Sequence, residues 1–432
     1  MYKAYITRIK NLRKHSNADR LQIGECFGNS VIVDLKTQEN ELGVYFPTDG
    51  QLGIEYATEN NLLRTKDENG NNTGGYLDPN KRNIVAIKLR GEKSDGLFMP
   101  LISLNKFTDI ALLKEGETID ILDGVVICQK YIPKRSGGGN SSGSSKKSKT
   151  LENLYPQFEE HIDTGQLEYN LNNFKENDLC YMSLKLHGTS QRTAYTLKEQ
   201  TKKTFSNWIK SKLRIGKPTI TYSYNYVSGT RRRVLEEYQG FYGSELYRKN
   251  YHDFFVGKLN KGEEVFYEVV GYTDTGKLIM GECNNKKTND KEFIKKYGAT
   301  TKFTYGCNSN ESQIYVYRMT ITNPDGYVVD YPTELVKQRC EEMGVNFVPI
   351  LDKFLFSSKD DLLDRAKAFS YGSDLIDPSH IREGVVVRID NRKKFTAFKY
   401  KSFEFKVLEG IIKAEATEPD IEEGEEISCD KE

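Results

Sequence analysis

Lys185 lies near the end of an apolar alternating run over residues 179–186, where burial of its charged side chain would be unfavourable. Lys185 is followed within five residues by Gly188 and the small hydroxyl residues Thr189 and Ser190. Burying an ammonium group costs free energy, so either the side chain reaches solvent beside a turn or the site needs an amine at a strand end. In the second case, a desolvated lysine near other cations has a lowered pKa and becomes a nucleophile. The choice depends on the partners that the rest of the chain supplies.

Two carboxylates enter segments that are otherwise nearly apolar. Glu268 lies within the run 264–272, and Glu383 directly precedes Gly384 and three valines. An unpaired buried glutamate is costly, so each predicts a cation, a sugar hydroxyl or a metal ion beside it. The glycine also lets another group approach the backbone closely.

Cationic and aromatic residues complete the set of candidates. Lys399 and Lys401 are two residues apart in a predicted strand, so they point to the same face and form a paired positive site. Arg231 begins a run of three arginines, which is either surface charge or a phosphate site. Tyr317 lies in an alternating aromatic segment, which is either core packing or a shelf for base stacking.

The charge of the chain is unevenly distributed. Lys plus Arg number 63 and Asp plus Glu 62, and residues 415–432 are strongly acidic with few large apolar side chains. This composition predicts a solvated tail. The remaining body is basic, which is compatible with a polyanionic partner, although solubility alone would also explain it.

Cysteine usage and hydropathy bear on the compartment. The 7 cysteines form no Cys-x-x-Cys pair, which favours free thiols in a reducing compartment over structural zinc. The first residues lack the apolar run of a signal peptide, and no apolar stretch reaches the length of a membrane span. We therefore expect a cytoplasmic protein that does not use a membrane.

The pattern changes along the chain. Residues 1–132 alternate in short segments separated by Asn, Gly and Asp clusters, which predicts a small antiparallel barrel or sandwich. Residues 133–150 are Gly, Ser and Lys, which predicts a flexible tether. From about residue 166, strands and helices mix without strict alternation, which predicts the α+β class. The strands expected there are 179–186, 219–224, 264–272, 313–321, 384–389 and 396–400, and the helices are 246–256, 332–343 and 359–369.

Three phrases near the N-terminus carry a family resemblance. Residues 15–21 and 89–97 resemble the OB-fold module of tRNA-binding and synthetase-appended domains. Together with residues 44–47 between them, they look like the N-terminal OB domain of one branch of RNA ligases. OB barrels share architecture without sharing function, so these phrases predict the fold of residues 1–132 but not by themselves an activity.

The order of the later motifs carries a second resemblance. Lys-x-x-Gly, an arginine, a glutamate in a strand, an aromatic strand, Glu-Gly-Val-Val-Val and Lys-x-Lys follow the motif order of the covalent nucleotidyltransferases, the polynucleotide ligases and mRNA capping enzymes. The lead phrase Lys-x-His-Gly-Thr and residues 403–406 look most like RNA ligases, closest to the branch with an N-terminal OB domain. Ser190 and Arg318 depart from the family, which often has Asn and Asp at these positions.

This resemblance implies an ATP-dependent RNA ligase that joins 3′-hydroxyl and 5′-phosphate ends through a lysyl-AMP intermediate. It implies ATP and a divalent ion, Mg²⁺ or Mn²⁺, as cofactors and RNA ends, nicked or single-stranded, as partners. We expect a monomer. The implied catalytic residues are Lys185, Lys399 and Lys401. The implied cofactor-binding residues are Gly188, Arg192, Arg231, Glu268, Tyr317 and Glu383, with Glu268 and Glu383 also holding the metal. The implied domains are an OB-fold-like RNA-binding β-barrel (1–132), a linker (133–165), an α+β nucleotidyltransferase domain (166–412) and an acidic tail (413–432).

Two alternatives stay open from the sequence. The enzyme class also includes DNA ligases and capping enzymes that use GTP. Outside that class, the chain would be an RNA-binding or tRNA-binding protein with a degenerate nucleotidyltransferase domain.

Overall fold

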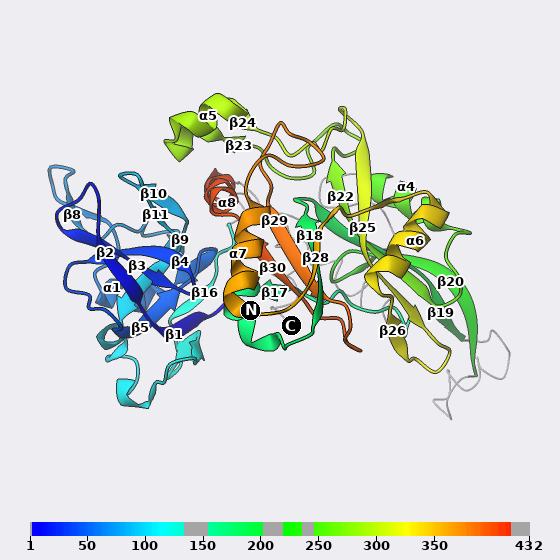
Figure 1. Ribbon diagram of the computed structural model, residues 1–432, viewed down its shortest axis with the longest axis horizontal. Helices are drawn as coiled ribbons and strands as arrows, with labels where there is room; N and C mark the ends of the chain where they lie inside the picture. Colours follow the sequence, from blue (N-terminus) through cyan, green and yellow to red (C-terminus); the bar gives the residue numbers. More distant parts are fainter. Residues whose placement is uncertain (1, 134–153, 202–218, 236–245, 416–432) are drawn as a thin grey trace, which may run out of the picture. The chain divides into compact units, whose positions relative to one another are not determined.

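The computed structural model describes residues 2–133, 154–201, 219–235 and 246–415. Most of the predicted linker and residues 416–432 of the predicted tail lie outside the described residues. The described chain divides into two compact units (Figure 1). The first comprises 2–133, 283–300 and 403–415, and the second comprises 154–201, 219–235, 246–282 and 301–402.

The first unit is built mainly from short antiparallel strands. Its three larger sheets have the strand orders β12-β5-β1-β13, β2-β3-β4 and β16-β6-β9. The strands of these sheets are β1 (Ala4–Arg8), β2 (Lys10–Lys14), β3 (Leu21–Cys26), β4 (Asn29–Asp34), β5 (Leu42–Phe46), β6 (Gly50–Leu52), β9 (Asn83–Ile84), β12 (Leu97–Pro100), β13 (Thr118–Ile119) and β16 (Cys128–Lys130). The two-stranded pairs are β7 (Thr65–Lys66) with β8 (Asn72–Gly74), β10 (Ile87–Leu89) with β11 (Glu92–Ser94), β14 (Ile121–Leu122) with β15 (Val125–Val126), and β23 (Cys283–Asn284) with β24 (Thr300–Thr301).

Apolar strand residues of the first unit form one core with its short helix α1 (Ile54–Glu59). Ile6, Val44 and Phe46 of adjacent strands are fully buried there against Tyr56 of α1. Alternate residues of a strand point to one face, so this core follows from the alternating pattern of the sequence. The remaining helices of this unit are α5 (Lys291–Tyr297), α8 (Phe403–Glu415) and the 3-10 turns η1 (Leu101–Leu104), η2 (Ile110–Leu112) and η5 (Asn285–Thr288).

Helix α8 belongs to the first unit although it follows the last strand of the second unit directly in sequence. The ammonium of Lys406 lies 2.8 Å from the carboxylate of Asp95, and both side chains are buried. A buried charge is tolerated only when it is paired, so this contact fixes how α8 lies on the first unit. Residues 283–300 and 403–412, which the sequence places in the second domain, are thus packed with the first unit.

The second unit contains two sheets. One has the order β17-β30-β29-β18-β28, and the other has the order β21-β20-β19-β22-β25-β26 with β27 also paired to β25. The strands of the first are β17 (Gly165–Gln166), β18 (Leu179–Lys185), β28 (Ile350–Leu355), β29 (Gly384–Ile389) and β30 (Ala397–Lys401). The strands of the second are β19 (Thr189–Thr201), β20 (Ile220–Gly229), β21 (Val234–Leu235), β22 (Glu263–Gly271), β25 (Ser312–Thr322), β26 (Val328–Asp330) and β27 (Asn346–Phe347). The 3-10 turns η3 (Leu167–Tyr169) and η4 (Leu171–Asn173) precede β18.

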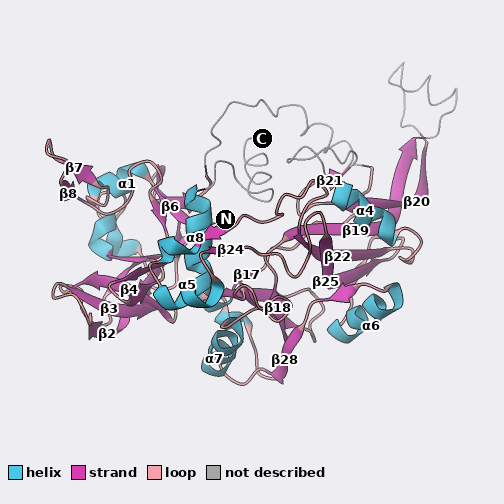
Figure 2. Ribbon diagram, turned by 90° about the horizontal axis from the view of Figure 1, so that it is seen from above, coloured by secondary structure: helices cyan, strands magenta, loops and turns pink. Residues whose placement is uncertain are grey.

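Helices cover one face of each sheet of the second unit. Helix α7 (Lys359–Ser370) packs on β29 and β30, with Leu362 and Ala366 in the same core as Met182 (Figure 1). Helices α4 (Leu246–Phe255) and α6 (Thr333–Met343) share a core with alternate residues of β22, and Figure 2 shows α4 beside β19 and β20. Because side chains alternate along a strand, Lys185 on β18 and Glu268 on β22 lie on the faces opposite these cores.

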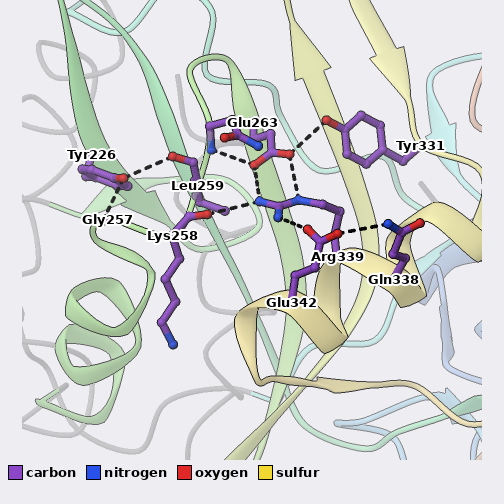
Figure 3. A network of polar contacts seen from close by, with 10 residues as sticks. Tyr226, Gly257, Lys258, Leu259, Glu263, Tyr331, Gln338, Arg339 and Glu342 are labelled. Carbon is purple, nitrogen blue, oxygen red and sulfur yellow. Dashed lines mark hydrogen bonds and ion pairs between the residues drawn. The ribbon is translucent and has the colours of Figure 1, made fainter.

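A buried polar network fastens α6 to the start of β22 (Figure 3). Both carboxylate oxygens of Glu263, which is almost fully buried, accept hydrogen bonds from Arg339 of α6, at 2.8 and 3.1 Å. The Tyr331 hydroxyl donates a further bond of 3.0 Å to the same carboxylate. Burial alone would raise the pKa of Glu263, but the bonds from Arg339 hold this pKa below its ordinary value. The network therefore fixes the strand that carries Glu268.

All the strands and helices that the sequence predicts from residue 179 onward are present, with small shifts at most of their ends. The longer elements that were missed include β19 directly after Gly188, β28 and the helices α5 and α8, and the short strands β21, β23, β24, β26 and β27 were also not predicted. In β19 the polar residues Thr189 to Thr193 are buried, so the apolar alternation that would reveal a strand is lacking.

Among the described residues, no helix combines the length and apolar character that crossing a membrane requires. The cysteines at 26, 128, 180, 283, 307 and 340 are all free and buried. This confirms the expected free thiols for every cysteine that the structure describes.

Candidate active site

Three strand ends place Lys185 and Lys401 on either side of a glycine. Lys185 is the last residue of β18 and pairs across the sheet with Gly384, which in turn pairs with Lys401 of β30. A Cβ atom at Gly384 would lie 1.9 Å from the carbonyl oxygen of Tyr400. Only glycine therefore fits here, so position 384 places no side chain between the two lysines.

Glu383 joins these lysines into one cluster. Its Oε1 lies 2.8 Å from the Nζ of Lys185 and 3.7 Å from the Nζ of Lys401, while only 2% of its side chain is exposed. Burial alone would raise the pKa of Glu383, but the charges of Lys185 and Lys401 hold it below its ordinary value. The carboxylate also opposes the repulsion that we expected the neighbouring lysines to exert on Lys185. The amine must therefore leave this ion pair before it can attack an electrophile.

Lys399 extends the positive cluster along the same face of β30. It pairs with Val386 of β29 and Gln166 of β17, so it lies two residues along β30 from Lys401, which is in register with Gly384 and Lys185. The pKa of Lys399 is lowered to about 8, first by burial and then by repulsion from Lys401 and Lys185. The cluster thus places three cations where an anion with several oxygens would be held.

The binding of inorganic pyrophosphate is expected to weaken about tenfold as the pH rises through about 8, because Lys399 loses its proton and one charge-assisted contact. Calorimetric titration from pH 6.5 to 9.5 would measure this change. The Lys399→Arg variant keeps its charge over that range, so its binding should not decline there. An equal decline in both proteins would exclude Lys399 as the titrating group.

Glu268 and Gly188 lie at the start of the second sheet. Gly188 passes directly over β22, where a Cβ atom would lie 2.4 Å from the carbonyl oxygen of Val269 and 2.8 Å from the Cγ of Glu268. Ser190 pairs with Glu268 across the strands, and its hydroxyl donates a hydrogen bond of 3.2 Å to this carboxylate. Ser190, a departure from the family pattern, therefore orients Glu268.

The predicted stacking residue and its neighbour differ in environment. Tyr317 is partly exposed, and its hydroxyl lies 3.2 Å from Nδ1 of His161. Arg318 is buried and forms an ion pair with Asp330, with Nε 2.6 Å from Oδ1. Arg318, the second departure from the family pattern, therefore stabilises the sheet through Asp330. It is buried, whereas Tyr317 is partly exposed.

The structure pairs the two predicted phosphate-binding arginines with protein groups. Arg192 is almost fully buried, with Nη1 3.4 Å from Glu264 and Nε donating to the carbonyl oxygen of Thr230 at 3.0 Å. Arg231 lies 3.5 Å from the carboxylate of Asp163. Arg192 thus holds the turn that carries Arg231, and nucleotide contact by either arginine stays a prediction.

Several residues around the site were missed from the sequence. Arg248 of α4 is fully buried and donates to the carbonyl oxygen of Ser190 and to the hydroxyl of Thr189, at 3.0 and 2.7 Å. The position of Arg248 within the aromatic predicted helix 246–256 is the sequence feature that could have indicated its buried role. Glu264 also lies in a predicted strand, and burial raises its pKa to about 7 despite the opposing charge of Arg192.

The carboxylates present suit a hard divalent ion that arrives with a nucleotide. Oε2 of Glu383 is buried and has no hydrogen-bond partner in the described part of the chain, so it is free to accept one. Within the same part of the chain, no cluster of at least three His, Cys, Asp or Glu residues forms a complete metal site. Mg²⁺ commonly uses one or two carboxylates and completes its shell with phosphate oxygens and water, which Glu268 and Glu383 would permit.

Comparison with known proteins identifies the fold. No protein-family model and no curated protein sequence matches the chain. Among solved structures, a Naegleria gruberi RNA ligase variant with ATP and Mn superposes with a TM-score of 0.57 at 15% identity, covering 93% of this chain and 98% of that chain. The same ligase with pyrophosphate gives a TM-score of 0.57 at 16% identity, covering 93% and 97%. The chain therefore shares this fold over nearly all of both lengths.

Proposed function

We propose, from the fold that this chain shares with the Naegleria gruberi RNA ligase, that it is an ATP-dependent RNA ligase. The substrates are an RNA 3′-hydroxyl end and an RNA 5′-phosphate end. The observation that carries the proposal is the cluster of Lys185, Lys399 and Lys401 around Glu383. It combines an amine at a strand end with two further cations on the same face, as phosphoryl transfer to nitrogen requires.

In the first step, Nζ of Lys185 attacks the α-phosphorus of ATP. A P–N bond forms, the P–O bond to pyrophosphate breaks, and the amine gives up its proton. Negative charge grows on the phosphate oxygens and on the leaving pyrophosphate. Lys399 and Lys401 stabilise that charge more in the transition state than in the ground state.

In the second step, an oxygen of the RNA 5′-phosphate attacks the phosphorus of lysyl-AMP. The P–N bond breaks, and Lys185 leaves as an amine that takes up a proton. In the third step, the RNA 3′-hydroxyl attacks the phosphorus of the RNA 5′-phosphate and gives up its proton, the P–O bond to AMP breaks, and the phosphodiester bond forms. Each transfer is an in-line displacement, so positioning and charge stabilisation supply most of the catalysis.

The remaining site residues bind and orient the nucleotide. Tyr317 stacks on the adenine, Arg231 contacts phosphate, and Gly188 lets the nucleotide approach the backbone. Arg192 acts through the turn that it holds. A divalent ion held by Glu268 and Glu383 would neutralise phosphate charge.

The domain assignments and the setting belong to the same proposal. The first unit is an OB-fold-like barrel that binds RNA, and the second unit is the nucleotidyltransferase domain. A linker within residues 133–165 and an acidic tail within residues 413–432 are proposed from their composition. The buried contact between Lys406 and Asp95 supports counting α8 with the barrel. We propose that the protein acts as a cytoplasmic monomer.

A sealing assay tests this function. Nicked duplex RNA and single-stranded RNA with a 5′-phosphate are incubated with the protein, ATP and Mg²⁺ or Mn²⁺, and joined products are expected on denaturing gels. Parallel reactions with DNA ends, and with GTP in place of ATP, should give at most weak product. Tight RNA binding without any joining or labelling would favour the degenerate RNA-binding protein instead.

A further inference from the structure

A short segment upstream of Lys185 lies on the face that carries the predicted nucleotide contacts. We call residues 158–163 the upstream segment. The ring of Phe158 lies 3.8 Å from the guanidinium carbon of Arg192. The backbone N–H of Glu159 donates a hydrogen bond of 3.1 Å to Glu264, and its carbonyl oxygen accepts one from Arg192. These contacts anchor one end of the segment to buried residues of β19 and β22.

The middle of the upstream segment contacts the predicted adenine site. His161 lies 3.2 Å from the hydroxyl of Tyr317, and the two rings meet edge to face with centroids 6.0 Å apart. The same imidazole lies 6.4 Å from the ring of Phe266 on the neighbouring strand. A flat, polar-edged ring of the protein therefore lies against the aromatic side chain proposed to bind a base.

The far end of the upstream segment contacts the predicted phosphate site. Oδ2 of Asp163 lies 2.7 Å from the guanidinium of Arg232, and Oδ1 lies 3.5 Å from that of Arg231. A carboxylate and a phosphate are both anions whose oxygens accept hydrogen bonds from a guanidinium group, so they compete for the same donors. The imidazole of His161 thus contacts the residue proposed to bind the base of ATP. Two residues later, the carboxylate of Asp163 contacts the arginines proposed to bind its phosphates.

We propose that the upstream segment occupies the nucleotide-binding face in the absence of ATP, and that Asp163 limits the apparent affinity for ATP. This rests on the proposed function for the identity of the nucleotide. Binding of ATP breaks the ion pairs of Asp163 and frees Arg231 and Arg232 for phosphate oxygens. The anchor at Phe158 and Glu159 stays in place, because it contacts buried groups rather than the arginine run.

The size of the effect follows from exposure. The side chain of Asp163 is 47% exposed, and those of Arg231 and Arg232 are 21% and 36% exposed. Ion pairs of this kind are weak, so their loss should change the affinity for ATP by about two- to fivefold. A larger change would require deeper burial than these side chains have.

The test compares Asp163→Asn with Glu160→Gln in the full-length protein. Glu160 is exposed on the same segment and makes no ion pair with another described residue, so its substitution removes the same charge without the contact. Calorimetry without divalent metal measures the binding of ATP and of inorganic pyrophosphate while no chemistry occurs. We expect Asp163→Asn to bind both about two- to fivefold more tightly, and Glu160→Gln to bind them as the wild type does.

Unchanged or weaker binding by Asp163→Asn, or equal tightening by both variants, would overturn the inference. Failure of all three proteins to bind ATP would overturn it as well. Self-labelling with ATP and Mn²⁺ is measured separately to keep the two proposals apart. Tighter binding by Asp163→Asn in a protein that takes no label would reject the ligase and retain the role of the segment.

Discussion

Lys185→Ala is expected to abolish covalent labelling of the protein by ATP that carries the label in its α-phosphate. The loss should be at least about a thousandfold, as is usual when a catalytic nucleophile is removed. The physical reason is that Lys185 alone stands at the end of β18, whereas Lys401 lies across Gly384 on another strand. Gel autoradiography after incubation with ATP and Mn²⁺ measures the labelling.

Two controls separate chemistry from folding. Lys185→Arg keeps the positive charge opposite Glu383 but has no nucleophilic nitrogen, so it should also take no label. RNA that already carries AMP on its 5′-phosphate bypasses the first two steps, and both variants should seal it within about tenfold of the wild-type rate. Normal labelling of either variant would contradict the assignment of Lys185.

Glu383→Gln should have the second-largest effect. The amide loses the carboxylate that joins Lys185 to Lys401 and that would hold the divalent ion, so labelling should fall by at least about a hundredfold. Removing one partner from a buried ion pair costs about 3–5 kcal/mol, so the free energy of unfolding should also fall. Denaturant titration and labelling below the melting temperature measure the two effects separately.

The stabilisation that Glu383 provides should decrease at acidic pH. The pKa of Glu383 in the folded protein lies below its ordinary value of 4.5, so its contribution is present above pH 4.5. The contribution is lost as the pH falls through the folded pKa, and the wild type and Glu383→Gln should converge there in stability. Glu282→Gln is the matched control, because Glu282 pairs with Lys302 while both are more than half exposed. Equal behaviour of the two variants would mean that Glu383 is not the charge that organises the cluster.

Strand periodicity made much of this site accessible from the sequence. Lys399 and Lys401 were predicted on one face because they are two residues apart, and the structure places both in β30 near Lys185. The glycine of the Glu-Gly-Val-Val-Val phrase was expected to permit close approach, and Gly384 does so between two lysines.

The parts that could not be predicted depend on contacts between distant segments. The burial of Arg192 against Glu264 is one such contact, which the sequence does not reveal. Residues 158–163 were assigned to a linker, since nothing local shows that Asp163 meets Arg232. Helix α8 was missed for a related reason: its position depends on Lys406 reaching Asp95, which lies far away in the chain. Local propensity carries no information about such pairings.

Peptide mapping of the labelled protein tests the central claim most directly. The wild-type protein is incubated with ATP and Mn²⁺, digested at neutral to alkaline pH to preserve the acid-labile P–N bond, and analysed by mass spectrometry. We expect one added AMP per chain, located on Lys185, and its release when RNA with a 5′-phosphate is added. An adduct on Lys399, on Lys401 or on any residue other than Lys185 would contradict the account.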